Sequence, residues 1–301
     1  MLHRELGEDG RARGAGIIGG MRKLRGFTLI EIVVVIAIVG LLLAMATFAT
    51  RAITIQQRIS TTATRLATVD AALVSFVMVQ KRLPCPADGT IASGGVNAGV
   101  EGARDSNGCT GNQANGVVPW VALGLSESDA TDGWLRRITY RVPVALTADN
   151  TVGGMDMSYC DPAGTAAIVA TAVCNTACTS TTLASCTPPQ AFLLSKGLQV
   201  QNIAGTVLLN PAGSPATGAA YVLISHGESG GGAYLNSGAL ATSTTTDGTE
   251  EQKNYANLAL GGYYVDDGIS DVPGATHFDD MLSHPTILTV INKAALGPRS
   301  H

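Results

Sequence analysis

Charged side chains are scarce in this sequence, and basic ones are the minority. Only 14% of the 301 residues are Asp, Glu, Lys or Arg. Residues 1–26 hold six of the 19 Lys and Arg and three of the 23 Asp and Glu, so the remainder holds 13 basic and 20 acidic residues. This acidic balance gives no electrostatic reason to bind nucleic acid, which favours clustered Lys and Arg. Gly, Ala, Ser and Thr are abundant instead, a composition common in exported and assembled proteins.

Long apolar runs are also scarce, and the one that stands out covers residues 27–49. It is long enough to cross a bilayer as a helix, which takes about 20 residues. A single acidic residue, Glu31, interrupts it. An ionised carboxylate in the bilayer costs roughly 2.5–3.5 kcal/mol on insertion scales, so it is a functional candidate that needs a partner. The alternative is an ordinary single-pass anchor with a stray glutamate.

Basic residues precede this apolar run, and no comparable cluster follows it closely. They are Arg22, Lys23 and Arg25. Because positive charge stays cytoplasmic, we expect a cytoplasmic N-terminus and export of everything after Thr50. Residues 14–19 match G-x-G-x-x-G, but no strand precedes them and a membrane helix follows, so we attribute this match to chance.

The segment Gly26-Phe27-Thr28-Leu29-Ile30-Glu31, placed after a basic stretch, resembles the processing signature of type IV pilins and type II secretion pseudopilins. In that family a membrane peptidase cuts after the glycine, and the new N-terminal phenylalanine is usually methylated. The resemblance implies that residues 1–26 are a leader and that Gly26 and Phe27 flank the cut. Met21 by itself would begin a leader of normal length, so residues 1–20 are a candidate for a mis-assigned start.

The same resemblance assigns Glu31 to assembly, where it pairs with the N-terminal amine of a neighbouring subunit. A buried carboxylate opposite a buried ammonium is tolerable, whereas either alone is not. The implied partners are the prepilin peptidase, other pilins or pseudopilins bound through the N-terminal helix, an inner-membrane assembly platform and the lipid bilayer. The implied location is the inner membrane, crossed once with the C-terminal domain in the periplasm, and then a pilus or pseudopilus fibre.

An apolar stripe continues the helical period beyond the membrane segment. Its members alternate at spacings of four and three: Ile55, Ile59, Thr62, Leu66, Val69, Leu73 and Phe76. Pro84 and Pro86 end the pattern. We therefore expect one helix from about residue 27 to 81, with residues 27–49 in lipid and residues 50–83 amphipathic against the exported domain. A coiled-coil seam is the alternative, but the stripe barely reaches three heptads.

Residues 84–301 are expected to form one β-rich exported domain without internal repeats. Alternation predicts a strand over 135–142, and weaker strands are expected over 166–173, 191–195 and 219–225. Residues 84–116 are rich in turn-forming residues. We expect a mobile loop over residues 235–254 and a strand or short helix over residues 285–296. Asp132-Gly133-Trp134 resembles an Asp-x-Trp element of many pseudopilins. The resemblance to the family implies an α+β architecture: a long N-terminal helix packed on an antiparallel sheet with disulfide-closed loops.

All cysteines follow the membrane segment, in a region expected to be exported. They are Cys85, Cys109, Cys160, Cys174, Cys178 and Cys186. An even count in an exported region indicates disulfides, with fifteen connectivities open. Proximity in sequence favours Cys85–Cys109, with the other four linking residues 160–186. A zinc site is the alternative, because Cys174 and Cys178 have ligand-like spacing, but an oxidising compartment disfavours free thiolates.

The motif Gly227-Glu228-Ser229-Gly230-Gly231 fits G-x-S-x-G and follows a strand-like run, so a serine hydrolase using Ser229 is a minor alternative. His277 and His284 lie downstream with several aspartates, in the hydrolase order. The motif needs a helix after the serine, and the glycine-rich residues that follow are a poor helix start. We therefore expect a glycine-rich turn and no catalytic residues.

Acidic residues gather near the C-terminus, at Asp266, Asp267, Asp271, Asp279 and Asp280. Calcium prefers several carboxylate and carbonyl oxygens on loops, and some major pseudopilins use a C-terminal calcium site. The spacing does not match an EF-hand, so a solvated acidic loop is favoured over calcium. No other cofactor is expected.

These features favour a minor pilin or pseudopilin that is cut between Gly26 and Phe27 and assembles into a type IV pilus-like or type II secretion fibre. The alternative is a membrane-tethered exported binding module, such as an adhesin or a DNA-uptake receptor, that never polymerises. Glu31 distinguishes them, because a mere tether has no need of it.

Overall fold

The computed structural model describes residues 26–105, 108–111, 113–148, 157–158, 190–242, 248–255, 262–270 and 272–296. Four of the cysteines (Cys160, Cys174, Cys178 and Cys186), Asp271 and the strand expected over 166–173 lie outside these residues. The chain forms two compact units, Met1–Ala52 and Ile53–His301. We refer to them as the N-terminal unit and the C-terminal unit.

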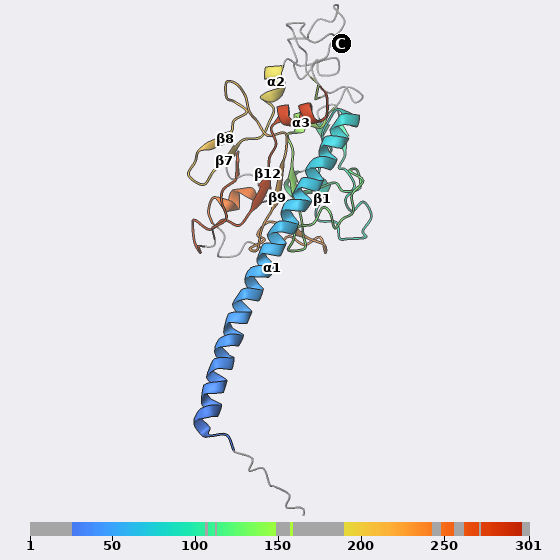
Figure 1. Ribbon diagram of the computed structural model, residues 1–301. Coiled ribbons are helices and arrows are strands. Elements are labelled where there is room, and N and C mark those ends of the chain that lie inside the picture. The colour runs from blue at the N-terminus through green and yellow to red at the C-terminus, as the bar shows by residue number, and fades with distance from the viewer. Residues whose placement is uncertain are drawn as a thin grey trace, which may run out of the picture. The chain divides into compact units, whose positions relative to one another are not determined.

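The described part of the N-terminal unit is the start of helix α1 (Leu29–Gln80), drawn in blue in Figure 1. Every side chain from residue 26 to 45 is exposed, and nearly all are apolar. A helix that is apolar all round belongs in a membrane or a larger core. By length and composition, this one is apolar enough to cross a membrane. Its surface therefore requires apolar surroundings that the described residues of the unit do not supply.

Within the C-terminal unit, α1 buries one face as the stripe predicted. Thr62, Leu66, Val69 and Leu73 are buried, and Val77 continues the buried row. The other members of the predicted stripe are half-buried: Ile55, Ile59 and Phe76. The helix ends at Gln80, and the predicted helix from 27 to 81 is confirmed to within two residues. It stops where Lys81 takes a left-handed conformation, with φ of 58°, a few residues before Pro84 and Pro86.

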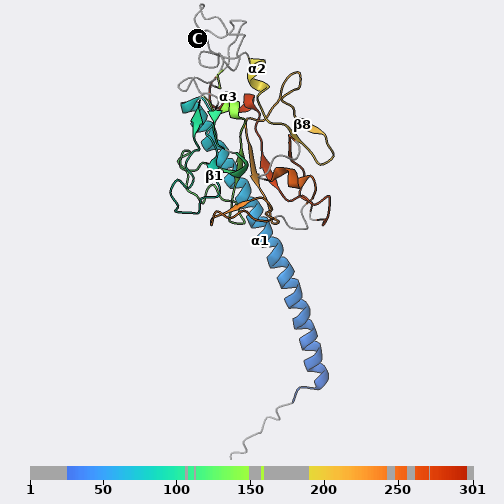
Figure 2. The same cartoon turned by 180° about the vertical axis from the view of Figure 1, so that it is seen from behind.

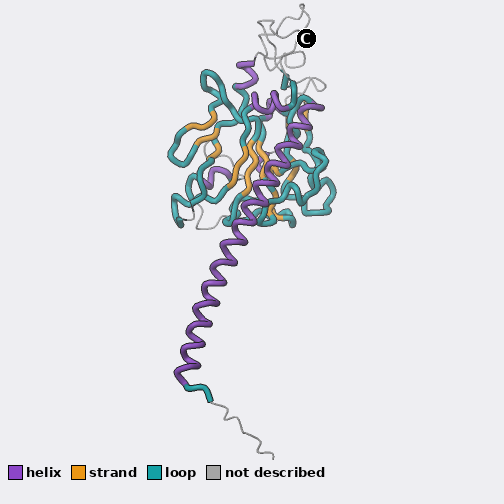
Figure 3. The backbone as a smooth tube through the Cα atoms, viewed as in Figure 1, coloured by secondary structure: helices purple, strands orange, loops and turns teal. Residues whose placement is uncertain are grey.

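The main sheet has five short strands, each antiparallel to its neighbours. In spatial order they are β1 (Ala87–Asp88), β4 (Gly116–Val117), β6 (Thr139–Arg141), β9 (Val222–Ser225) and β12 (Met281–Ser283). Figure 2 shows the same elements from behind, and Figure 3 shows that loops connect them over most of this unit. The α+β fold class, a long helix packed with antiparallel sheets, is confirmed.

Strand β9 separates two apolar clusters because successive side chains of a strand point to opposite faces. Leu223 joins the large core formed with Leu66 and Leu73 of α1 and Tyr140 of β6. Val222 and Ile224 point the other way and join a smaller cluster. That cluster also contains residues of a three-stranded sheet: β11 (Tyr264–Val265), β7 (Val200–Gln201) and β8 (Val207–Leu209). Here β11 is parallel to β7.

The strand predicted over 135–142 is present but divided. β5 (Arg136–Arg137) pairs with β10 (Tyr234–Leu235), and β6 pairs in the main sheet. Between them Ile138 donates its N–H to Ala130 and accepts from Val118, so its backbone is bonded to loops. Alternation located the extended segment but did not show that its two halves belong to different sheets.

The sequence predictions for three later segments have different outcomes. The strand expected over 191–195 is wrong, because helix α2 (Gln190–Leu194) occupies it. The C-terminal segment is helix α3 (Ile287–Lys293), capped by Thr286, whose hydroxyl accepts from the Thr289 N–H. The expected mobile loop over 235–254 ends in the 3₁₀ helix η4 (Glu251–Asn254), whose Glu251 and Asn254 are buried.

The turn-rich stretch after α1 is closed by the predicted Cys85–Cys109 disulfide, with 5.6 Å between the two Cα atoms. The hairpin of β2 (Arg104–Asp105) and β3 (Gly108–Cys109) lies within it. Two short 3₁₀ helices follow, η1 (Gln113–Asn115) and η2 (Val144–Leu146). Leu146 of η2 belongs to the large core.

The loop from Thr131 to Trp134 lies directly against α1. Gly133 donates its N–H to the Thr62 hydroxyl at 2.9 Å, and Arg65 Nη1 donates to the carbonyls of Thr131 and Asp132. A Cβ at Gly133 would lie 2.3 Å from the Arg58 carbonyl oxygen. Glycine is therefore required here because the loop backbone touches the helix backbone.

Gly133→Ala should destabilise the C-terminal unit by about 1–3 kcal/mol, because the added methyl group forces the loop away from α1. Denaturant unfolding of the purified full chain in detergent measures the change. Gly111→Ala is the matched control, because a Cβ there meets no atom within 4 Å. Equal unfolding midpoints for the two variants would contradict this account of the contact.

Candidate functional site

The first turn of α1 has a reciprocal pair of hydrogen bonds between Thr28 and Glu31. The Thr28 N–H and hydroxyl donate to Glu31 Oε2 at 2.9 and 3.0 Å. The Glu31 N–H donates back to the Thr28 hydroxyl at 3.3 Å. This is a capping box, in which an N-cap threonine and a glutamate three residues later satisfy backbone N–H groups of the first turn.

The capping box uses only one oxygen of the Glu31 carboxylate. Both hydrogen bonds that it accepts end on Oε2, and Oε1 has no partner within the described residues. The side chain is exposed, on a surface that is otherwise apolar. Among the described residues, therefore, no cation balances this negative charge.

The two residues at the predicted cut are accessible. Phe27 is 80% exposed and precedes the helix, and a Cβ built on Gly26 meets no atom within 4 Å. An exposed, uncrowded segment next to a capped helix is a geometry that a peptidase can bind. The predicted residues Gly26, Phe27 and Glu31 thus lie together at the start of α1.

A protein-family model for the prokaryotic N-terminal methylation motif matches residues 21–47. This segment contains the basic residues, Gly26, Phe27, the capping box and most of the apolar helix. The chain carries the type IV pilin-type N-terminal signature. No curated protein and no solved structure matches the chain.

The match supports a type IV pilin-like exported protein, as predicted from the residues around Gly26. It is consistent with anchoring by a single membrane-spanning helix, with processing by a prepilin peptidase and with assembly alongside other pilins. The match ends at residue 47, so it carries no information on the C-terminal unit.

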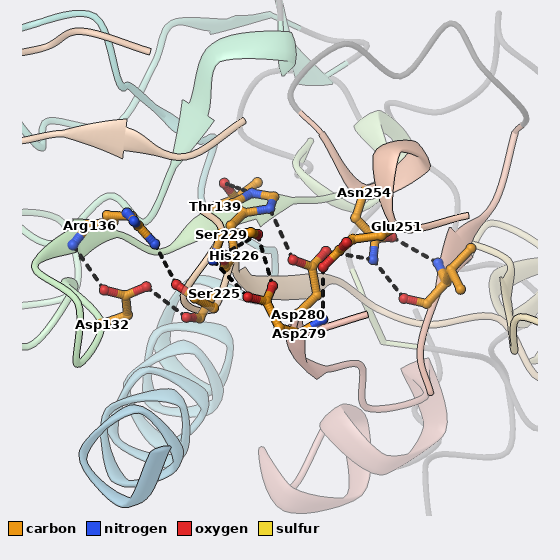
Figure 4. A network of polar contacts seen from close by, with 12 residues as sticks. Asp132, Arg136, Thr139, Ser225, His226, Ser229, Glu251, Asn254, Asp279 and Asp280 are labelled. Carbon is orange, nitrogen blue, oxygen red and sulfur yellow. Dashed lines mark hydrogen bonds and ion pairs between the residues drawn. The ribbon is translucent and has the colours of Figure 1, made fainter. Parts of the chain in front are cut away.

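The C-terminal unit contains a polar network around the end of β9, drawn in Figure 4. At one side, Asp132 accepts hydrogen bonds from the Ser225 hydroxyl at 2.7 Å and from the N–H groups of Trp134 and Arg136 at 2.9 Å. Burial raises the pKa of Asp132, and these hydrogen bonds oppose the rise. The Arg136 guanidinium donates to the carbonyls of Gly227 and Glu228, which fixes the turn after β9.

In the middle of the network, His226 is fully buried between two partners. Its Nε2 lies 3.0 Å from the Thr139 hydroxyl, and its Nδ1 lies 3.5 Å from Asp280 Oδ1. The other oxygen of Asp280 accepts from the Asn254 amide at 2.9 Å. Burial raises the pKa of Asp280, and His226 opposes this rise.

At the other side, Asp279 and Glu251 form a buried carboxyl pair. The Ser229 N–H and hydroxyl donate to the two oxygens of Asp279 at 2.7 and 2.9 Å. Glu251 accepts from the Asp279 N–H at 2.8 Å, and its Oε2 lies 2.9 Å from His277 Nδ1. Burial, together with the neighbouring Glu251, raises the pKa of Asp279 to about 6.

The geometry around Ser229 differs from that of a hydrolase. Its hydroxyl donates to Asp279, whereas a nucleophilic serine is activated by an adjacent base such as histidine. His277 faces Glu251, and His284 Nε2 lies 2.8 Å from Asp266. Gly227 and Gly230 have positive φ, and the residues after Ser229 form turns, in keeping with the glycine-rich turn expected from the sequence.

The aspartates proposed for calcium have separate partners in the described structure. Asp266 faces His284, and Asp267 accepts from the N–H groups of Ile203 and Gly268. Asp279 faces Ser229, Asp280 faces His226 and Asn254, and Asp271 lies outside the described residues. Among described residues, the ligand-type side chains that converge are Glu251, His277 and Asp279.

Two residues were missed by sequence reasoning. Thr28 had a signal, because Thr-x-x-Glu before an apolar run is a capping-box pattern. Glu251 had none, because it lies 28 residues from Asp279 and meets it only through folding.

Thr28→Val should weaken the first turn of α1, because valine keeps the shape of threonine but lacks the hydroxyl that contacts Glu31. A lost cap costs about 1 kcal/mol, which corresponds to about a fivefold faster amide exchange at Glu31. Hydrogen exchange of the full chain in detergent micelles measures this rate. Thr28→Ser, which keeps the oxygen, should exchange as the unmodified chain does, and equal rates in both variants would refute the cap.

Proposed function

We propose that the chain is a minor pilin or pseudopilin subunit, made as a precursor, cut between Gly26 and Phe27 and assembled into a fibre through α1. The observation that carries this proposal is a single carboxylate, Glu31, on a helix whose other residues from 29 to 45 are apolar; one of its oxygens has no partner among the described residues. The methylation motif over residues 21–47 supports it.

In this proposal, the basic residues before the apolar helix set the direction in which the chain crosses the membrane. Arg22, Lys23 and Arg25 stay in the cytoplasm, and the C-terminal unit is exported to the periplasm. The peptidase then removes the basic leader, so the mature chain begins with the ammonium group of Phe27. Cleavage converts an uncharged peptide nitrogen into a cation next to an apolar helix.

The new ammonium group and Glu31 supply each other's missing partner. An isolated charge in lipid is costly, and a second copy or sister subunit offers the opposite charge at a fixed height on its own helix. The pair sets the stagger between subunits, because every other stagger leaves two charges unpaired. Packing of the apolar helix surfaces supplies the remaining cohesion.

No catalytic role is assigned to the C-terminal unit in this proposal. The polar network from Asp132 to Glu251 holds the turn after β9 against η4 and β12, and Ser229 is one of its donors. The partner subunits, the peptidase and the assembly platform are proposed from the resemblance in the signature.

Gly26→Val should leave an uncut precursor that carries all of residues 1–26. A Cβ at Gly26 meets nothing within 4 Å, so failure to cut reports recognition by the peptidase and not misfolding. Mass spectrometry of the membrane-inserted chain, expressed with a prepilin peptidase, measures the N-terminus. A mature N-terminus at residue 27 in this variant would contradict the proposed cut, and Gly111→Ala serves as a control for glycine replacement elsewhere.

Glu31→Gln should be cut normally but enter fibres at least about tenfold less well, since an unpaired ammonium group in the helix bundle costs more than 1.4 kcal/mol. The ratio of mature chain in the sheared fibre fraction to that in the membrane measures incorporation. Glu31→Asp is the control that retains the charge. Equal ratios for the two variants would favour a membrane-tethered module that does not polymerise.

A further inference from the structure

Three segments of the C-terminal unit converge at one group of ligand-type side chains. Glu251 comes from η4, and His277 and Asp279 come from the segment before β12. Their donor atoms all lie within 4.8 Å of one another, with His277 Nδ1 2.9 Å from Glu251 Oε2. Ser229, on the turn after β9, contacts Asp279 from the other side, as Figure 4 shows.

This group is almost removed from solvent. Glu251 is fully buried, Asp279 is 6% exposed and His277 is 9% exposed. Carboxylates are rarely buried unless they are paired or coordinate a metal ion. The buried carboxylates of Glu251 and Asp279 therefore require a nearby cation or a bound proton.

The positive charge available nearby is insufficient. Asp280, one peptide bond from Asp279, is a third buried carboxylate. Within the described residues, these three carboxylates contact backbone N–H groups, Ser229, Asn254 and two histidines, and no Lys or Arg pairs with them. Even two protonated histidines would leave a net negative charge, which is costly in a buried site.

A separate observation also indicates that the network is incomplete. Within the part of the chain that the structure describes, Asp280 Oδ1 and His226 Nδ1 are buried and make no hydrogen bond, although they face each other at 3.5 Å. Such groups are few in folded proteins and call for an explanation such as an ion or water that completes the network.

The ligand oxygens are already held in place by neighbouring donors. Glu251 accepts from the N–H groups of Gly248 and Asp279 at 3.0 and 2.8 Å. Ser229 holds both oxygens of Asp279. Glu251 Oε1 and each oxygen of Asp279 accept one of these hydrogen bonds and keep a second lone pair, so the bonds orient these oxygens without occupying them, as outer-shell contacts do in metal sites.

We propose that Glu251, His277 and Asp279 bind a divalent transition metal ion, Zn²⁺ by preference. One imidazole nitrogen and two carboxylate oxygens form a donor set typical of zinc, whereas calcium takes six to eight oxygens. The ion neutralises two buried carboxylates and fastens η4 to the segment before β12. This site does not depend on whether the chain polymerises.

The test measures zinc bound to the full chain purified in detergent. After stripping with a chelator, the chain is dialysed against ZnCl₂, CaCl₂ or no metal, and bound metal and unfolding temperature are measured. The unmodified chain should retain about one zinc ion and unfold at a higher temperature with zinc. Glu251→Gln and His277→Gln should bind zinc at least about tenfold more weakly.

Asp267→Asn is the matched control, because Asp267 is an exposed acidic residue outside the group, and it should bind zinc as the unmodified chain does. Circular dichroism checks the fold of each variant, and if Glu251→Gln fails to fold, the less buried His277→Gln decides. No zinc on the folded unmodified chain would overturn the proposal in favour of a proton shared by the carboxyl pair. Equal stabilisation by calcium, or unchanged zinc binding by His277→Gln, would overturn the assignment of metal and ligands.

Discussion

The structure depends first on an apolar helix surface that no described part of the chain covers. Residues 29–45 of α1 are exposed all round, and one carboxylate interrupts them. Such a surface is stable in lipid or when packed among similar helices, but not when it is exposed to water. The Thr28–Glu31 capping box makes the carboxylate tolerable by giving one oxygen two donors, while it leaves the charge itself uncompensated. In the proposed function, storage in a membrane and selective contact with a cation both follow from this one arrangement.

The second half of α1 is joined to the polar core by hydrogen bonds between neighbouring residues and by one close contact between His226 and Asp280. Thr62 holds Gly133, and the adjacent Asp132 holds Ser225 at the end of β9. The next residue, His226, faces Asp280 beside the Asp279–Glu251 pair. The helix is thus fixed by apolar packing along one face and by polar contacts near its middle. Rigidity of this kind suits a domain that is carried by a single helix.

The helix and its buried face were predictable, because a period of 3.6 residues and the two prolines are local signals. The Cys85–Cys109 disulfide was also predictable, since the two cysteines are close in sequence. Strand partners were not: Ile138 divides one extended segment between two sheets, which depends on residues about 100 positions away. The same holds for the site. Gly26, Phe27 and Glu31 form a contiguous motif, whereas Glu251 meets Asp279 only because η4 and β12 are brought together by the fold.

The Cys85–Cys109 disulfide has a mechanical consequence. Tension along a fibre would enter the C-terminal unit through α1, and Cys85 is five residues beyond the end of that helix. The 24-residue separation closed by the disulfide corresponds to about 80 Å of extended chain, which a covalent cross-link withholds from stretching. Under the proposed function, a pulling force would therefore reach Cys109 across the bridge as well as β4 through its pairing with β1 (Ala87–Asp88), and the chain between the two cysteines could not be drawn out.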